Sequence, residues 1–243
     1  MTQGIQIKNQ VQVKGKDITR SGSSDVGRFL ETVKRVPARK TGTEPGRLIF
    51  AMDATLSRAA TWDMATHIQN EMFDSTANLG GLAIQLCHFK GFREFSSSDW
   101  CTDGDALRDQ MSRVRCSGGQ TQIHRVLSHC LNENRRQKIQ ALVFVGDAME
   151  ENADSLCELA GQMGISKIPA FVFQEGVDQT TRQTFQEIAR LSGGAYAPFN
   201  LTSADELKSL LSAVAVYAAG GSKALLNIKN NKAVGLLTRQ LKE

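Results

Sequence analysis

Short, fully apolar runs alternate with helix-like segments along most of this chain. The runs Leu48–Met52 and Ala141–Val145 contain no polar residue, which is typical of strands buried on both faces of a parallel sheet. Between such runs, apolar residues recur at the spacing of an amphipathic helix. A chain that alternates these elements buries its strands in a sheet that helices cover on both faces.

The pattern predicts six strands, at residues 48–52, 82–89, 92–100, 141–145, 169–174 and 196–199. Lys90 and Gly91 alone separate the second strand from the third, which is too short for a crossover helix, so these two strands should pair antiparallel. Helices are predicted near residues 60–77, from Thr102, from Thr121, around 156–163, up to Gly193, and at 203–219. The predicted fold class is α/β: a doubly wound, mostly parallel six-stranded sheet with one antiparallel edge strand and helices on both faces.

Charge divides the chain into three parts. Residues 1–46 contain nine Lys/Arg and four Asp/Glu, residues 47–221 contain fifteen and twenty, and residues 222–243 contain five and one. We therefore predict a basic N-terminal arm at 1–45 with a short helix at 24–36, one domain at 46–219, and a basic tail at 220–243. The acidic body argues against a nucleic-acid-binding domain, although the basic arms could contact nucleic acid through salt-sensitive contacts.

The sequence also indicates in which cellular compartment the protein is expected. It has no apolar run near the length of a membrane span, and its first residues lack the apolar region of a signal peptide. Five cysteines without a C-x-x-C pair argue against a disulfide framework. His124 and His129 are five residues apart, so on a helix they point in different directions and cannot share a metal. We expect a cytoplasmic protein with reduced thiols.

Oxygen-bearing side chains follow the predicted strands. Asp53, Thr55 and Ser57 come directly after the first strand, Thr121 opens a helix, and Asp147 follows the strand at 141–145. Ligands gather at the carboxyl ends of parallel strands, so these side chains should converge. Two carboxylates and three hydroxyls suit a hard cation such as Mg²⁺ or Mn²⁺. Because hydroxyls neutralise little of its charge, the ion would keep an open position for a carboxylate of another molecule.

The run Asp53-Ala54-Thr55-Leu56-Ser57, taken with Thr121 and Asp147, resembles the metal-ion-dependent adhesion site of von Willebrand factor type A (VWA) domains, whose pattern is Asp-x-Ser-x-Ser. Thr55 departs from that pattern but keeps the hydroxyl. The resemblance covers about residues 46–219. It implies that Thr55 and Ser57 touch Mg²⁺ (or Mn²⁺ or Ca²⁺), that Asp53 and Asp147 act largely through water, and that Thr121 does either.

The same resemblance implies a function. Stand-alone bacterial members are scaffolds or adaptors, often for ATPase or chaperone-type machines, so we expect a protein partner that offers an Asp or Glu to the metal. Movement of the last helix, at 203–219, would switch binding between weak and strong. Glu150 and Glu151 would either add charge near the ion or lie at the start of a surface helix.

Besides a nucleic-acid-associated protein that uses the basic arms, the sequence leaves two alternatives open. In one, Asp53 and Thr55 only cap the following helix while Asp147 starts a turn, and no metal binds. In the other, the chain is a metal-dependent phosphatase or phosphotransferase. An aspartyl nucleophile at Asp53 would usually be followed by a second Asp at position 55, which is Thr55 here, and no phosphate-binding loop is present.

Overall fold

The computed structural model describes residues 44–68, 70–74, 76, 81–199 and 204–228. The short helix predicted at 24–36 and the capping pair Ser203 and Glu206 lie outside the residues and side chains described. Strand bounds are Gly46–Asp53 (β1), Leu82–Lys90 (β2), Glu94–Cys101 (β3), Ala141–Gly146 (β4), Ala170–Glu175 (β5) and Ala195–Phe199 (β6). Helix bounds are Leu56–Arg58 (η1, a 3₁₀ turn), Ala59–Ile68 (α2), Asn70–Asp74 (α3), Gly104–Ser112 (α4), Ile123–Arg136 (α5), Ala153–Ile165 (α6), Gln179–Ser192 (α7) and Ala204–Ile228 (α8).

The strands form one six-stranded sheet in the order β3-β2-β1-β4-β5-β6. β3 pairs antiparallel with β2, and every other pairing is parallel. β1 and β4 are buried along their whole length at the centre, as their continuous apolar runs predict. β6 tolerates Pro198 because only β5 pairs with it. The predicted α/β fold class is therefore confirmed, including the antiparallel edge strand.

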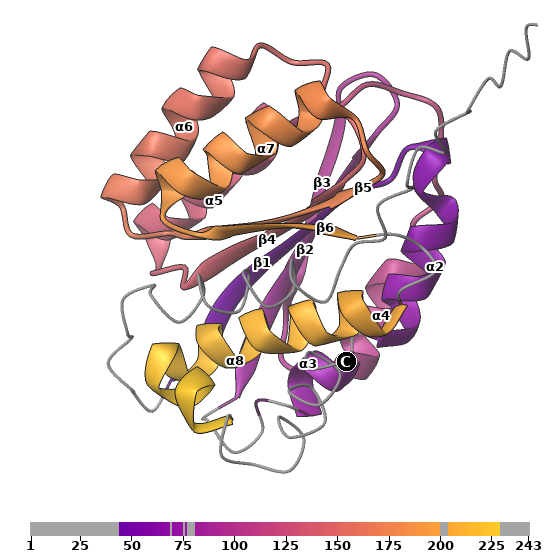
Figure 1. The fold of residues 1–243 in the computed structure, drawn as a ribbon. Coiled ribbons are helices and arrows are strands. Elements are labelled where there is room, and N and C mark those ends of the chain that lie inside the picture. Colours follow the sequence, from indigo (N-terminus) through magenta and orange to yellow (C-terminus); the bar gives the residue numbers. More distant parts are fainter. Residues whose placement is uncertain (1–43, 69, 75, 77–80, 200–203, 229–243) are drawn as a thin grey trace, which may run out of the picture.

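Helices cover both faces of the sheet (Figure 1). One buried cluster joins the sheet to α2, α3, α4 and α8, and the other joins its opposite face to α5, α6 and α7. Gly46 marks a close approach of backbones, since a Cβ there would lie 2.2 Å from the carbonyl oxygen of Ala218 in α8. No helix among the described residues is both long enough and apolar enough to cross a bilayer.

Several predicted boundaries differ from the structure. The segment at 60–77 contains two helices, α2 and α3, rather than one. The N-cap of α4 is Asp103, whose carboxylate accepts from the Ala106 amide at 2.8 Å, and not Thr102. The element α8 extends past Ala219, but Gly221 has the non-helical angles φ 69° and ψ −172°, so the chain kinks there and the first helical segment stops close to the predicted end at Ala219.

Candidate metal centre

The parallel strands β1, β2, β4 and β5 end on one side of the sheet, called here the carboxyl end. Asp53 is the last residue of β1 and is 1% exposed. Its Oδ1 accepts a hydrogen bond of 2.7 Å from the Thr55 amide, which bends the chain out of the strand. The Thr55 and Ser57 hydroxyl oxygens are 3.2 Å apart. The two-residue spacing of the sequence thus brings these two hydroxyls together beside a buried carboxylate.

Asp147 follows the neighbouring strand β4, and its Oδ1 is buried with no hydrogen-bond partner among the described atoms. The pKa of Asp53 is raised to about 6, mainly by burial and also by the charge of Asp147, while hydrogen bonds from Thr55 and the charge of Arg58 oppose the rise. The two aspartates therefore lie within electrostatic range of each other. A buried carboxylate oxygen without a donor is costly unless an ion or water meets it.

Thr121 lies at the start of α5 and is buried. Its amide donates to Glu150 Oε2 at 3.0 Å, and its hydroxyl accepts from the Glu150 amide at 3.1 Å. No hydrogen bond among the described residues joins Thr121 to either aspartate. The reciprocal pair ties the loop after β4 to α5, so it holds the Thr121 hydroxyl at the carboxyl end of the sheet.

Glu151 strengthens this connection. Its carboxylate accepts from the Ile123 amide at 2.5 Å and from the His124 amide at 2.9 Å, which supplies the capping that Gln122 does not. Of the two roles predicted for Glu150 and Glu151, the structure shows Glu151 at the first turn of a helix, while Glu150 binds Thr121 just before that helix. That helix is α5, however, and not α6, which follows them directly in sequence.

Two glycines let three loops touch at this end of the sheet. A Cβ on Gly119 would lie 2.3 Å from the Gly91 backbone, so the loop before α5 packs directly on the β2–β3 turn. The Ser117 amide donates to the Ala54 carbonyl at 3.1 Å, and the Gln120 amide donates to the Gly91 carbonyl at 3.2 Å. The loop of Asp53, Thr55 and Ser57 is thereby held against its neighbours.

Arg58 is a charged residue of this region that the sequence reasoning missed. It is 0% exposed, and its Nη1 forms an ion pair with Glu175 at the end of β5, which also accepts from the Thr61 hydroxyl. Its Nε and Nη2 have no partner among the described atoms. Burial lowers the pKa of Arg58, while the charges of Asp147 and Asp53 raise it, so the guanidinium lies in the field of both aspartates. Glu175 is the last residue of β5, so its position at the end of a predicted strand was the signal that could have identified it.

The charges of this cluster fit one divalent cation. Asp53, Asp147 and Glu175 provide three carboxylates, and Arg58 provides one guanidinium, which leaves a net charge of about −2 in a largely buried space. No group of three His, Cys, Asp or Glu side chains converges as a ligand set among the described residues. An ion here would therefore depend on the hydroxyls of Thr55, Ser57 and Thr121 and on water, a hard-oxygen donor set.

The other sequence candidates lie apart from this cluster. His129 Nε2 is 2.8 Å from Gln85 Oε1 on β2, and His124 is exposed in the first turn of α5. All five cysteines are described and unpaired, as the sequence predicted.

Comparison with known proteins finds similarity of fold. No protein-family model matches the sequence, and no curated protein matches it. Among solved structures, the SpRpn10 VWA domain superposes with a TM-score of 0.52 at 14% identity, covering 69% of this chain and 92% of that one. An aerotolerance-related membrane protein from Bacteroides fragilis gives a TM-score of 0.54 at 15% identity, covering 68% and 96%.

Proximal thread matrix protein 1 from the mussel byssus, in a structure with a zinc-occupied MIDAS motif, gives a TM-score of 0.54 at 12% identity. That match covers 72% of this chain and 47% of the mussel protein. Identities this low establish the fold and leave the metal site and the function to be tested. The described residues of this chain have the fold of a von Willebrand factor type A domain.

Proposed function

We propose that this protein is a metal-dependent protein-interaction module. It binds one divalent cation, Mg²⁺ before Mn²⁺ or Ca²⁺, through direct contacts of Thr55 and Ser57. Thr121 acts directly or through water, and Asp53 and Asp147 act largely through water. The open position of the ion accepts an Asp or Glu of a protein partner. An ATPase or chaperone-type partner and a bacterial source stay predictions of the resemblance, and a cytoplasmic location stays a prediction of the sequence.

The observation that carries this proposal is the unpartnered Oδ1 of Asp147, buried within range of Asp53. A cation satisfies that oxygen and offsets the net negative charge of the cluster. The alternative in which these residues only cap a helix leaves both features unexplained. In fact η1, which follows Thr55, has no side-chain cap. The mussel structure with zinc in its MIDAS motif supports metal binding on this fold.

Isothermal titration of Mg²⁺ and Mn²⁺ into the full chain tests the proposal. We expect wild type to bind one ion and Asp53→Ala to bind at least about tenfold more weakly, the usual cost of losing a group that orients a metal. Asp105→Ala is the matched control, because Asp105 is an exposed carboxylate paired with Arg108 on α4. Equal binding by all three proteins would contradict the proposal.

A further inference from the structure

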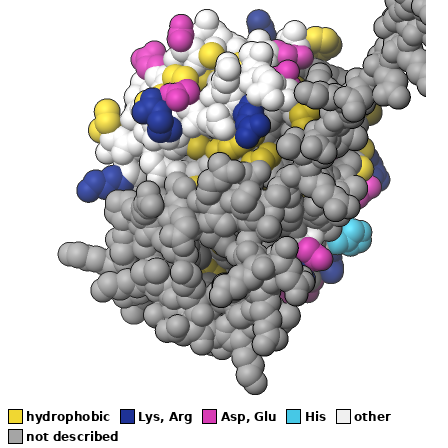
Figure 2. All heavy atoms as spheres, in the orientation of Figure 1, with side chains coloured by type: hydrophobic (Ala, Val, Ile, Leu, Met, Phe, Trp, Pro, Cys, Tyr) yellow, Lys and Arg dark blue, Asp and Glu magenta, His cyan; other side chains and the backbone are white. Residues whose placement is uncertain are grey.

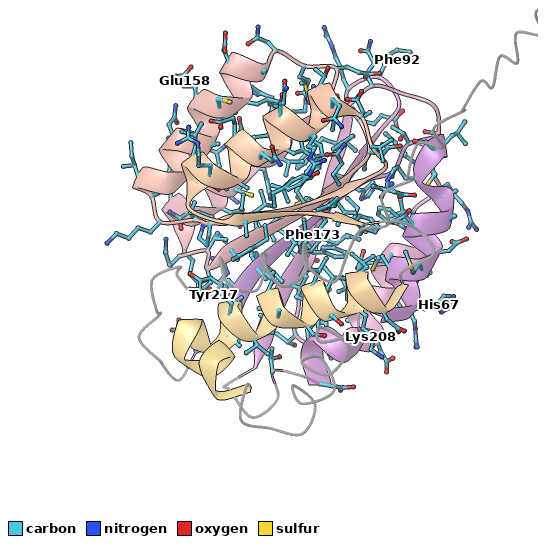
Figure 3. The ribbon with its side chains drawn as sticks, in the orientation of Figure 1. His67, Phe92, Glu158, Phe173, Lys208 and Tyr217 are labelled. Carbon is cyan, nitrogen blue, oxygen red and sulfur yellow. The ribbon has the colours of Figure 1, made fainter. Side chains whose placement is uncertain are left out.

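Exposed apolar side chains gather at the carboxyl end of the sheet. Among the described residues, four large hydrophobic side chains are exposed: Leu56 (66%), Phe92 (78%), Ile165 (85%) and Val177 (84%). Leu56 follows β1, Phe92 lies in the β2–β3 turn, and Val177 follows β5, so three of these four lie at that end. Figure 3 shows Phe92 at the outer end of the turn, directed away from the domain. Clustering of this kind marks a contact surface more often than single exposed residues do.

Leu56 and Phe92 belong to two loops that both contact the loop before α5. A Cβ on Gly118 would lie 3.9 Å from Leu56 Cδ1, and the next residue, Gly119, packs on Gly91 beside Phe92. Both apolar side chains therefore flank the candidate metal centre on the β2 side. Val177 lies on the other side of the centre, because β1 and β4 separate β2 from β5 in the sheet.

Cationic side chains surround the turn that carries Phe92. Lys90 Nζ donates to the Arg115 carbonyl at 3.3 Å, and Arg125 Nη1 donates to the Arg93 carbonyl at 2.7 Å. Among the described residues, no carboxylate lies within 4 Å of the guanidinium groups of Arg93, Arg115 and Arg125. The nearby anion is Glu94, whose side chain lies over Gly91. We call this surface the hairpin rim: Leu56, Lys90, Phe92, Arg93, Arg115 and Arg125.

The rim contrasts with the rest of the domain. Residues 47–221 carry fifteen basic and twenty acidic side chains, whereas the rim has four basic residues and Glu94 is the acidic side chain beside them. Figure 2 shows Lys, Arg, Asp and Glu side chains mixed over the described surface of α6 and α7. A local basic patch on an acidic body attracts negatively charged partners and repels basic ones.

We propose that the hairpin rim binds an acidic segment of a partner protein that also carries apolar side chains. Apolar groups of the segment pack on Phe92 and Leu56, and its carboxylates pair with Arg93, Arg115 and Arg125. The proposal rests on the proposed function in one respect: one carboxylate of the segment is the one that the metal accepts.

The charges of the rim and of the two arms select this occupant over two others. The chain's own arms at 1–46 and 222–243 are both basic, so the rim repels them. A nucleic acid would satisfy the arginines, but the rim offers a single aromatic ring, Phe92, and the aliphatic Leu56 adds no second surface for a base to stack on. An acidic, partly apolar peptide uses every member of the rim.

Selection of random displayed peptides against the full chain in Mg²⁺ provides the probe. We expect the enriched peptides to combine Asp or Glu with Leu, Ile, Val, Phe or Trp. The most enriched peptide is then synthesised with a fluorophore, and its affinity is measured by anisotropy. Phe92→Ser and the double variant Arg93→Glu/Arg125→Glu should each weaken binding about tenfold or more. Ile165→Ser is the matched control, because Ile165 is 85% exposed at the end of α6, away from the carboxyl end, and it should stay within about twofold of wild type.

Distinct outcomes separate this inference from the proposed function. If Asp53→Ala and chelation abolish peptide binding while the rim variants do not change it, the rim proposal is wrong and the metal site stands. If the rim variants abolish binding while chelation has no effect, the rim stands and the metal-dependent function is wrong. Circular dichroism and thermal unfolding show whether each variant is folded.

Three further results would overturn the rim proposal. One is a selection without enriched peptides, and another is enrichment of Lys- and Arg-rich peptides. The third is rim-dependent binding of a labelled single-stranded RNA that exceeds peptide binding at the same salt concentration.

Discussion

Two buried arginines lie at opposite ends of β1, and they are satisfied to different degrees. Arg47, near the start of the strand, donates to the Gln137 carbonyl at 2.7 Å, pairs with Glu133 at 3.5 Å and stacks 3.8 Å above the Trp100 ring. Arg58, just past the end of the strand, pairs with Glu175 and leaves Nε and Nη2 without partners.

The difference separates a structural ion pair from a site prepared for a ligand. At the amino end of β1, the partners on α5 and Trp100 account for the cation within the described residues. At the carboxyl end, two unused donors of Arg58 and the unpartnered oxygen of Asp147 lie in a common buried field. Natural domains leave polar groups unpaired mainly where function requires it. The comparison thus points to the carboxyl end as the binding end.

The largest expected effect comes from replacing each arginine in turn. Arg58→Met should lower the free energy of unfolding by about 3 kcal/mol or more, because it leaves Glu175 half-buried without its cation. Arg47→Met should cost about 2 kcal/mol, since Glu133 keeps a 2.8 Å ion pair with Arg136. Urea unfolding of the metal-free proteins measures both losses.

The double variant Arg58→Met/Glu175→Gln is the control for this pair of substitutions. It leaves no charge at position 175 that has lost its cation, so it should recover most of the stability lost in Arg58→Met. An equal loss in Arg47→Met and Arg58→Met, or no recovery in the double variant, would contradict the contrast between the two ends.

The sequence predicted the two aspartates at the carboxyl end of the sheet but not the buried arginine beside them. The apolar runs at 48–52 and 141–145 place β1 and β4 at the centre of a parallel sheet, and the residues after them then share one end by geometry alone. For this reason Asp53 and Asp147 were predicted together, and the structure places them within electrostatic range. Whether they and the three hydroxyl residues bind a metal stays a prediction.

Arg58 was missed for a physical reason. A charged residue at the start of a helix is exposed in most proteins, so local pattern gives no sign of burial. Its burial depends on Glu175, a partner 117 residues further along the chain, and such pairing is a tertiary property. The hairpin rim was missed for a similar reason: residues 92–100 were assigned to a strand, whereas β3 begins at Glu94 and leaves Phe92 in the turn.

Metal-linked stability is the next largest effect and tests the carboxyl end directly. At Mg²⁺ concentrations about 100-fold above its dissociation constant, wild type should gain about 2.7 kcal/mol of unfolding free energy. Arg47→Met should gain the same amount, and Asp147→Ala should gain almost none. Arg58→Met should gain more than wild type at equal Mg²⁺, because its cluster has lost one positive charge. Urea unfolding with and without Mg²⁺ gives each value, and a loss of the gain in Arg47→Met would refute the assignment of the two ends.

The raised pKa of Asp53 predicts how pH acts at the carboxyl end. Burial raises this pKa to about 6, so in the metal-free protein the folded state holds the proton more tightly than the unfolded chain. The stabilising contribution of Asp53 is therefore complete below about pH 4 and is lost as the pH rises through about 6. Metal binding follows the opposite course, because the cation competes with that proton.

Titration calorimetry of Mg²⁺ binding across this pH range measures the competition. The affinity of wild type should fall about tenfold for each pH unit below about 6. Asp53→Asn should bind weakly with little pH dependence, and Arg47→Met should retain the wild-type profile. Equal Mg²⁺ affinity of wild type at about pH 5 and about pH 7.5 would argue against Asp53 as part of the metal centre.

The smallest change in the free energy of unfolding is expected for Arg136, at the amino end of β1. Arg136 is 79% exposed and pairs with Glu133, which Arg47 also contacts. Arg136→Ala alone should cost no more than about 0.5 kcal/mol, since solvent screens an exposed ion pair. In the Arg47→Met background the same change should cost about 1 kcal/mol more, because Glu133 then loses its last cation in a buried position. A double-mutant cycle from urea unfolding measures this coupling. Additive losses would mean that Arg47 stabilises the domain through Trp100 and Gln137 rather than through Glu133, whereas Arg58 would still depend on its carboxylate.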